Sequence, residues 1–193
     1  NSSGCAVEGF TISNTSATGT GLATAGATRL LRIAHNRVTK GSNCIVFNGT
    51  AVSNRIESNT ISYGNGRGVV LGQTASYTEI LSNNIFQNTT FNVHIDGPFN
   101  SLTSNYVHDI SQDNIKFNSS TASNNLVCFN RIENTGWSSI IVGTAVPNTK
   151  IFRNLILNGA SHVVTEGLST NTRCVNNTFS NNFAFGAIMA WAG

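Results

Sequence analysis

One short phrase recurs along the chain and limits what the chain can fold into. It consists of a hydrophobic residue, two residues of any kind, an Asn, one further residue and a second hydrophobic residue. "IESNTI", "LTSNYV" and "IFRNLI" are three copies, and "CVNNTF" has Cys in the first hydrophobic position. We call the Asn of each copy the anchor, and anchors recur every 21 to 25 residues. The anchors are Asn36, Asn59, Asn84, Asn105, Asn130, Asn154 and Asn177, with Phe10 filling the position in an eighth copy.

Two apolar columns flank the anchors. Three residues before them lie Val7, Ile33, Ile56, Leu81, Leu102, Val127, Ile151 and Cys174. Two residues after them lie Ile12, Val38, Ile61, Phe86, Val107, Ile132, Ile156 and Phe179. Further along each copy, an alternating pair is expected to point inward, because alternation is typical of a strand with one buried face. The pairs are Leu22/Thr24, Ile45/Phe47, Val69/Leu71, Val93/Ile95, Ile115/Phe117, Ile140/Val142, Val163/Thr165 and Ala187/Met189.

Repeats of this length, with several short strands apiece, predict an all-β solenoid in which each repeat is one coil of a parallel β-helix. Leucine-rich repeats would need several leucines per repeat, and a propeller blade needs ~40 residues or more. Successive coils of a β-helix lie ~4.8 Å apart, so equivalent side chains stack. We therefore interpret the anchors as an asparagine ladder whose amides bond to one another and to the turn backbone.

Composition excludes several classes of function. Only 10% of the residues are charged, but 39% are hydrophobic and regularly placed, which favours a packed core over disorder. The net charge of +3 comes from scattered basic residues, which argues against a nucleic-acid partner. No stretch approaches the ~20 apolar residues of a membrane span. The four cysteines form no CxxC pair, so we expect free thiols, no metal site and no cofactor.

The two ends of the sequence are unusual for a solenoid. "NSSGCAVEGFTI" has neither the basic start nor the apolar run of a signal peptide, and "FAFGAIMAW" near the other end is strongly apolar. Solenoids normally carry polar caps at both ends. We expect residues 1–193 to be a single β-helix domain within a longer chain, with its ends covered by further domains or by association into a homotrimer.

"VEGFTI", the recurring "IxxNxI" phrase and the "GVxL" phrase resemble the repeats of the pectin-lyase-like superfamily of right-handed parallel β-helices. The resemblance covers essentially the whole chain and implies about eight right-handed coils. That superfamily includes pectate lyases, polygalacturonases, alginate epimerases and lyases, and bacteriophage tailspike domains. Its members often bind sugar along an exposed parallel sheet, but the fold alone does not fix the chemistry. The "NTD", "DD", "GHG" and "RIK" lines of polygalacturonases are absent, as is an aspartate cluster resembling the calcium site of pectate lyases.

The same alternation predicts an outward column on the second strand of each coil. The column reads Ala23, Val46, Val70, His94, Lys116, Ile141, Val164 and Ile188. We expect the densest polar patch of the surface around His94 and Lys116, the two polar members of this column. His or Lys can transfer a proton while a carboxylate orients it or acts as an acid. The candidate catalytic residues are His94, Asp96 and Lys116, and the candidate substrate-binding residues are Asn92, Asn114 and Asn118. The alternative is an exposed ion pair between Asp96 and Lys116 worth ~0–1 kcal/mol.

A second candidate cluster lies in "YVHDISQDN" and consists of His108, Asp109 and Asp113, with Tyr106 beside them. The two aspartates form either a catalytic carboxylate pair or the Asx turns of a polar loop. A stripe of Arg32, Arg55, Lys150 and Arg173, interrupted by Ile80, Ser101 and Leu126, suits an acidic polysaccharide or, more commonly, is solvated surface.

Two functions remain open from the sequence. The first is a domain, extracellular or on a virion surface, that recognises a polysaccharide or cell-surface glycan and cleaves it as a lyase or glycoside hydrolase, as in a tailspike. The second is a non-catalytic shaft or adhesin segment whose outward residues only keep it soluble.

Overall fold

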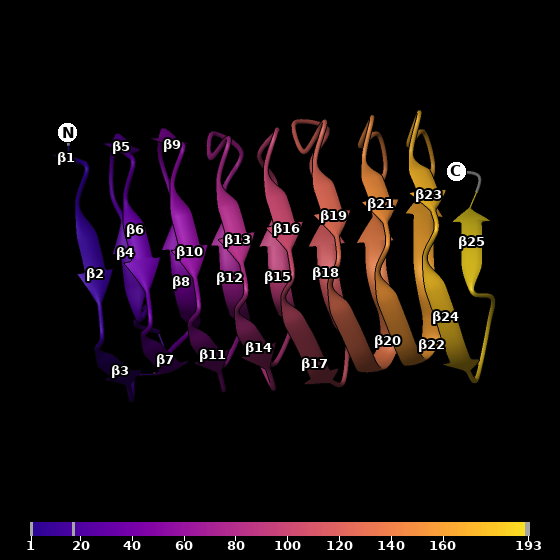
Figure 1. Ribbon diagram of the computed structural model, residues 1–193, viewed down its shortest axis with the longest axis horizontal. Coiled ribbons are helices and arrows are strands. Elements are labelled where there is room, and N and C mark those ends of the chain that lie inside the picture. Colours follow the sequence, from indigo (N-terminus) through magenta and orange to yellow (C-terminus); the bar gives the residue numbers. More distant parts are fainter. Residues whose placement is uncertain (1, 17, 192–193) are drawn as a thin grey trace.

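The computed structural model describes residues 2–16 and 18–191, which form a stack of parallel coils running from the N-terminal to the C-terminal end of the molecule (Figure 1). Each full coil contributes up to four strands, and neighbouring strands pair in parallel. The predicted right-handed parallel β-helix of about eight coils is confirmed. No helix long and apolar enough to cross a membrane occurs in the described ranges.

Most strands fall into three stacks. We name them the β10 sheet, the β11 arm and the β12 arm, after three consecutive strands of one coil. The β10 sheet contains β2 (Ala6–Glu8), β6 (Arg32–Ala34), β10 (Arg55–Glu57), β13 (Glu79–Leu81), β16 (Ser101–Thr103), β19 (Leu126–Cys128), β21 (Lys150–Phe152) and β23 (Arg173–Val175). The β11 arm contains β3 (Thr11–Asn14), β7 (Arg37–Lys40), β11 (Thr60–Ser62), β14 (Asn84–Phe86), β17 (Tyr106–Ile110) and β24 (Thr178–Asn182). The β12 arm contains β4 (Leu22–Thr24), β8 (Asn43–Phe47), β12 (Arg67–Leu71), β15 (Phe91–Ile95), β18 (Asp113–Phe117) and β25 (Ile188–Trp191).

Two long strands join the β11 and β12 arms into one sheet. β20 (Arg131–Val142) and β22 (Leu155–Glu166) each run through the bend without a break, so their first halves belong to the β11 arm and their second halves to the β12 arm. A small sheet of β1 (Ser2–Ser3), β5 (Thr28–Arg29) and β9 (Ala51–Val52) lies at the remaining corner of the N-terminal coils.

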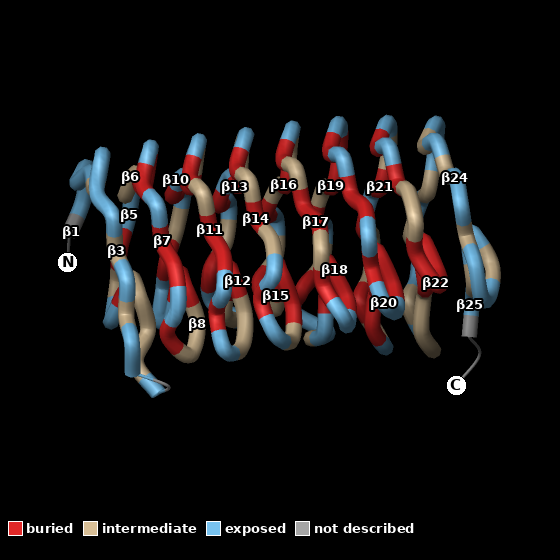
Figure 2. The backbone as a smooth tube through the Cα atoms, turned by 90° about the horizontal axis from the view of Figure 1, so that it is seen from below, coloured by how far each residue is buried: buried red, intermediate tan, exposed pale blue. Residues whose placement is uncertain are grey.

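The core is a set of apolar stacks inside the coils, seen as the buried inner segments in Figure 2. In the β10 sheet, Ile56 pairs with Ile33 on one side and Ile80 on the other. In the β12 arm, the predicted inward pairs from Ile45/Phe47 to Ile140/Val142 occupy matching rows and are fully buried. β-branched and aromatic side chains dominate these rows because they pack well on a pleated surface.

The asparagine ladder exists, with one member displaced by a residue. Along it, each Asn accepts hydrogen bonds at Oδ1 from the backbone N–H and the amide of the Asn one coil before. Asn36, for example, donates both to Asn59, at 2.9 and 3.1 Å. The fourth-coil member is Asn83 rather than Asn84, so that anchor was assigned wrongly. Phe10 fills the first position as predicted, with its N–H donating to Asn36 at 2.9 Å.

The same one-residue displacement makes the positions predicted for Leu81, Phe86 and Ile80 wrong. Ile80 and Ile85 are fully buried in the core columns, whereas Leu81 and Phe86, predicted there, are half-buried. Glu79, not Ile80, continues the outward charged stripe. "ILSNNIF" matches the phrase in both frames, so the sequence alone does not decide between them.

The last coil is also shifted by one residue. Ile188 pairs with the inward Val163 and Met189 with the outward Val164, so the predicted inward pair Ala187/Met189 is wrong. All four cysteines are free thiols, as expected. Burial raises the pKa of the Cys44 thiol to about 12, so this thiol stays protonated and inert at neutral pH.

Candidate functional site

His94 lies on the outer face of the β12 arm, in the row where Val70 precedes it and Lys116 follows it. Its neighbours Val93 and Ile95 are both in the core, so alternation turns His94 outward. The predicted side-by-side placement of His94 and Lys116 is therefore correct. The expected exposure is wrong: only 4% of His94 is accessible, because the side chains around it on the outer face cover its ring.

The imidazole of His94 has no hydrogen-bond partner. Its Nε2 lies 3.3 Å from Oδ1 of Asp96, but the two groups are not aligned for a hydrogen bond, and Nδ1 has no partner either. Asp96 therefore lies beside His94, directly after the end of β15, and forms no ion pair with Lys116. Buried polar atoms in proteins are nearly always paired. An imidazole with both nitrogens unpaired, next to a carboxylate, is a group prepared to bind or exchange a proton with a ligand.

Phe91 forms the base on which the charged groups of this face rest. Its ring centroid lies 5.3 Å from that of His94, 5.4 Å from Nζ of Lys116 and 5.7 Å from the guanidinium of Arg67. A cation over an aromatic face is attracted by the ring quadrupole and is held in place. Phe91 and Arg67 were not among the predicted site residues. Strict alternation would have placed Phe91 inside, with Val93.

Asn92 and Asn114 do not contribute to this outer face, contrary to the prediction. Both are fully buried, and the row that contains them is missing from the paired register on either side of β15. At this bend their side chains turn inward and form a second polar ladder. Asn92 accepts from the amide of Asn88 at 2.8 Å and donates to Oδ1 of Asn114 at 2.7 Å. The amide of Asn114 continues to the hydroxyl of Thr135. Asn118 is exposed at the end of β18, as expected.

A groove of about 490 Å³ extends from Lys116 toward the C-terminal coils. Its lining includes Asp113, Lys116, Trp137, Glu166 and Phe185. Trp137 is 69% exposed and offers a flat apolar surface. Asp113 is buried, with Oδ1 accepting from the N–H of Ser138 at 2.9 Å. Burial raises the pKa of Asp113, although Ser138 and Lys116 oppose the rise. The groove therefore contains a cation, an exposed aromatic ring and two carboxyl groups in different environments.

The second predicted cluster is only partly assembled. Nδ1 of His108 lies 2.9 Å from Asp109, and its Nε2 lies 2.9 Å from Oδ1 of Asn84. Asp109 also accepts from the amide of Asn134 at 2.7 Å. Asp113 shares none of these hydrogen bonds and lines the groove instead. The catalytic Asp109/Asp113 pair, one of the two alternatives that the sequence left open, stays a prediction.

The β11 arm adds Glu133 and Arg131 to this cluster, and the sequence suggested neither. Tyr106, which it did name, stacks on His108 with ring centroids 3.9 Å apart and donates its hydroxyl proton to Glu133. Glu133 also accepts from Arg131 at 2.7 Å. Burial raises the pKa of Glu133, but the hydrogen bonds from Tyr106 and Arg131 outweigh this and lower it overall. Both nitrogens of His108 and the Glu133 carboxylate are thus already paired within the protein, in contrast to His94.

Neither cluster resembles a metal centre. Within the described residues, no group of three or more His, Cys, Asp or Glu side chains lies close enough together to hold a metal ion. The charge-bearing groups of the His94 face are an imidazole, a carboxylate and an ammonium group, which suit proton transfer.

No protein-family model and no curated protein sequence matches the chain. Among solved structures it is similar to the A-module of the Azotobacter vinelandii mannuronan C-5 epimerase AlgE4, with a TM-score of 0.71 and 14% identity over 96% of this chain and 58% of that one. It is also similar to the periplasmic alginate epimerase AlgG, with a TM-score of 0.62 and 14% identity over 86% of this chain and 45% of that one.

The AlgE6 A-module of A. vinelandii gives a TM-score of 0.61 and 13% identity over 96% of this chain and 57% of that one. The chain thus spans about half the length of these structures. At this identity the likeness concerns the fold. Together with the parallel register and the stacked core, it shows that the chain has the fold of a right-handed parallel β-helix.

Proposed function

We propose that the chain binds an acidic polysaccharide along the outer face of the β12 arm and transfers protons to and from it at His94, Asp96 and Lys116. The observation that carries this proposal is the buried imidazole of His94, whose two nitrogens are unpaired beside Asp96. Leaving such groups unpaired costs about 1–3 kcal/mol each. A sugar that displaces the side chains covering His94, so that its polar groups reach His94 and Asp96, removes that cost.

The chemistry that suits this trio is removal of the proton on the carbon next to a uronate carboxylate. That proton is weakly acidic, so the reaction needs a base and a cation that stabilises the negative charge developing on the carboxylate. The proton passes to neutral His94, and the electron pair left on carbon is delocalised into the carboxylate beside Lys116. Asp96, 3.3 Å from Nε2, stabilises the imidazolium that results.

Two products follow from the same first step. Return of a proton to the opposite face of the ring gives the epimeric sugar, with no bond of the chain broken. Expulsion of the glycosidic oxygen on the adjacent carbon, which leaves with a proton, gives a double bond and a cleaved chain. Hydrolysis would instead need two carboxyl groups flanking the bond. The His94 face instead has an imidazole and an ammonium group beside a single carboxylate, so it lacks that pair of carboxyl groups.

The groove beside Lys116 supports binding of a chain rather than of a single sugar. It continues the His94 face along the coil axis and contains the exposed ring of Trp137, on which a sugar ring can stack. The solved structures similar in fold are described as acting on mannuronan and alginate, which makes polyuronates the first substrates to test. An extracellular or periplasmic location, where such polymers occur, belongs to the same proposal.

The test is incubation with polymannuronate, polyguluronate, polygalacturonate and neutral dextran in D₂O. Deuterium on the sugar carbon, measured by mass spectrometry, reports proton abstraction, while ultraviolet absorbance of the unsaturated product distinguishes elimination from epimerisation. His94→Gln should lower the rate by ~10²–10⁴-fold. The matched control is His35→Gln, because His35 is an exposed histidine on a turn.

Two outcomes would contradict the proposal. An unchanged rate in the double variant His94→Gln/Lys116→Gln would move the reaction to His108 and Asp109. Absence of both binding and deuterium incorporation with every glycan would favour the non-catalytic shaft.

A further inference from the structure

The outer face of the β10 sheet carries a charged column whose two ends differ. At the N-terminal end, Arg32 and Arg55 occupy the first position of their strands. Arg32 pairs with Glu8 and Glu57, and Arg55 lies 2.6 Å from Glu57 and 3.7 Å from Glu79. Each cation there is neutralised within the protein.

At the C-terminal end the same column holds Lys150 and Arg173, which are register partners on adjacent coils. Where the N-terminal strands have Glu8 and Glu57, these strands have Phe152 and Val175. Within the described ranges, Lys150, Arg153 and Arg173 form no ion pair. The two coils therefore present cations without acids.

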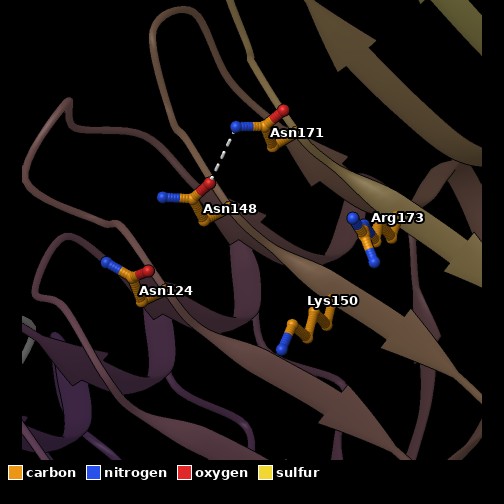
Figure 3. A pocket seen from close by; sticks show the side chains of 5 residues that line it. All are labelled: Asn124, Asn148, Lys150, Asn171 and Arg173. Carbon is orange, nitrogen blue, oxygen red and sulfur yellow. Dashed lines mark hydrogen bonds between the residues drawn. The ribbon is translucent and has the colours of Figure 1, made fainter.

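Asparagine amides line the hollow beside these cations. Lys150 and Arg173 border a depression of about 440 Å³ together with Asn124, Asn148 and Asn171 (Figure 3). The three asparagines have positive φ angles of 57°, 60° and 55°, so equivalent turns in successive coils place them in a row. The amide of Asn171 donates to Asn148 at 3.2 Å, which leaves the amide of Asn148 directed away from that bond. An Asn amide offers both donors and an acceptor, which suits sugar hydroxyl groups.

A third cation is held in place next to this row. The guanidinium of Arg153 lies 5.7 Å from the ring centroid of Phe129, and that ring packs edge-on against Phe152 at 5.7 Å. Arg153, Lys150 and Arg173 also line a second depression of about 440 Å³ with Phe152, Val175 and Asn176. Neither depression has an acidic side chain in its lining.

We propose that this Lys150 surface, defined as Lys150, Arg153, Arg173, Asn148 and Asn171, binds an anionic polysaccharide bearing carboxylate or sulfate groups, at a place separate from the His94 face. Cations stacked on successive coils match a polymer with repeated negative charges, and the amides between them match its hydroxyl groups. A nucleic acid would need a broader basic face than three cations in a chain of net charge +3. The surface has no acid–base pair, so its role is to hold the polymer.

The sequence offers a direct way to locate the bound polymer, because Lys40, Lys116 and Lys150 are its only lysines. A water-soluble carbodiimide couples polymer carboxylates to nearby lysine amines; the new amide forms as the carbodiimide takes up the elements of water. With short oligomannuronates, peptide mapping should find Lys150 coupled several times more than Lys40. Coupling of Lys116 reports on the His94 face independently, so each proposal can fail without the other. Equal coupling of Lys150 and Lys40 would overturn the Lys150 surface.

Affinity measurements provide a second test of the Lys150 surface. Lys150→Gln/Arg173→Gln should weaken binding of polymannuronate and dextran sulfate by about 10- to 100-fold and reduce the dependence of affinity on salt. Arg32→Gln/Arg55→Gln changes the net charge equally in the same column and should have much less effect. Comparing polymannuronate with dextran sulfate separates carboxylate from sulfate recognition. An equal loss in both variants, or tighter binding of single-stranded DNA than of either polymer, would contradict the proposal.

Discussion

Two positions of β15 that lie two residues apart, Asn92 inside the bend between the β11 and β12 arms and His94 on the outer face of the β12 arm, treat buried polar groups in opposite ways. Inside the bend, Asn92 is bonded to Asn88, to Asn114 and to the carbonyl of His108. On the outer face, His94 is nearly as buried, yet its ring nitrogens have no partner. Satisfied polar groups stabilise the coil, whereas unsatisfied ones at the surface reduce stability and leave binding capacity for a ligand.

The largest loss in the free energy of unfolding is expected from a substitution in the anchor ladder. Asn105→Ala removes the acceptor of the N–H and amide of Asn83, at 2.9 and 3.0 Å, and the donor to the carbonyl of Ile80. Each buried group left unpaired costs about 1–3 kcal/mol, so the free energy of unfolding should fall by about 5 kcal/mol in urea titrations. Asn177→Ala, at the half-buried end of the ladder, should cost clearly less. Equal costs would show that the ladder does not act through burial.

Adjacent residues of β18 test the two faces of the sheet directly. Phe117 is fully buried and Lys116 is on the outer face. Phe117→Ala should lower the free energy of unfolding by ~3–5 kcal/mol because it leaves a cavity in a stacked layer. Lys116→Ala should change it by less than about 0.5 kcal/mol. A large loss of stability in Lys116→Ala would contradict a role confined to ligand binding.

His94 and Asn92 can be compared by the same substitution. Asn92→Leu removes the acceptor of one bond from the Asn88 amide and the donor to Oδ1 of Asn114 and to the carbonyl of His108, so it should cost about 3 kcal/mol. His94→Leu removes unpaired polar atoms, so the free energy of unfolding should stay constant or rise by about 1 kcal/mol, while proton transfer to the polysaccharide is lost. A His94→Leu variant as unstable as Asn92→Leu would mean that the imidazole is a structural group.

The smallest effect concerns Asp113, whose carboxyl has a raised pKa because it is buried. A raised folded-state pKa means that its contribution to stability is fully present below the unfolded-state pKa and is lost as pH rises through the folded-state value. Asp113→Asn keeps the acceptor for the N–H of Ser138 and removes the charge. The variant should equal the wild type below about pH 3.8, the ordinary value for Asp, and be slightly more stable at pH 7. A variant less stable than wild type at pH 7 would show that the ionised form is favoured.

The sequence by itself determined the coil, because a stacked repeat places equivalent residues in the same environment many times. Most members of the apolar columns, of the inward pairs of the β12 arm and of the anchors could be assigned from spacing alone. Repetition also placed His94 beside Lys116, since both lie in a regular part of their strands. The pattern could not decide which of the consecutive residues Asn83 and Asn84 is the anchor, because both frames fit. Only the packed structure shows Asn84 bonded to His108 on the outside.

The tertiary structure decided everything that lies at a bend. Alternation assigns a side chain to a face only while successive residues stay in the paired ladder. At Asn92 and Asn114 the ladder omits a row, so those side chains turn inward and Phe91 lies on the outside with Arg67 and Lys116. The contrast between neutralised Arg32 and uncompensated Lys150 depends on which residues of neighbouring coils meet, and only the register of the β10 sheet fixes that.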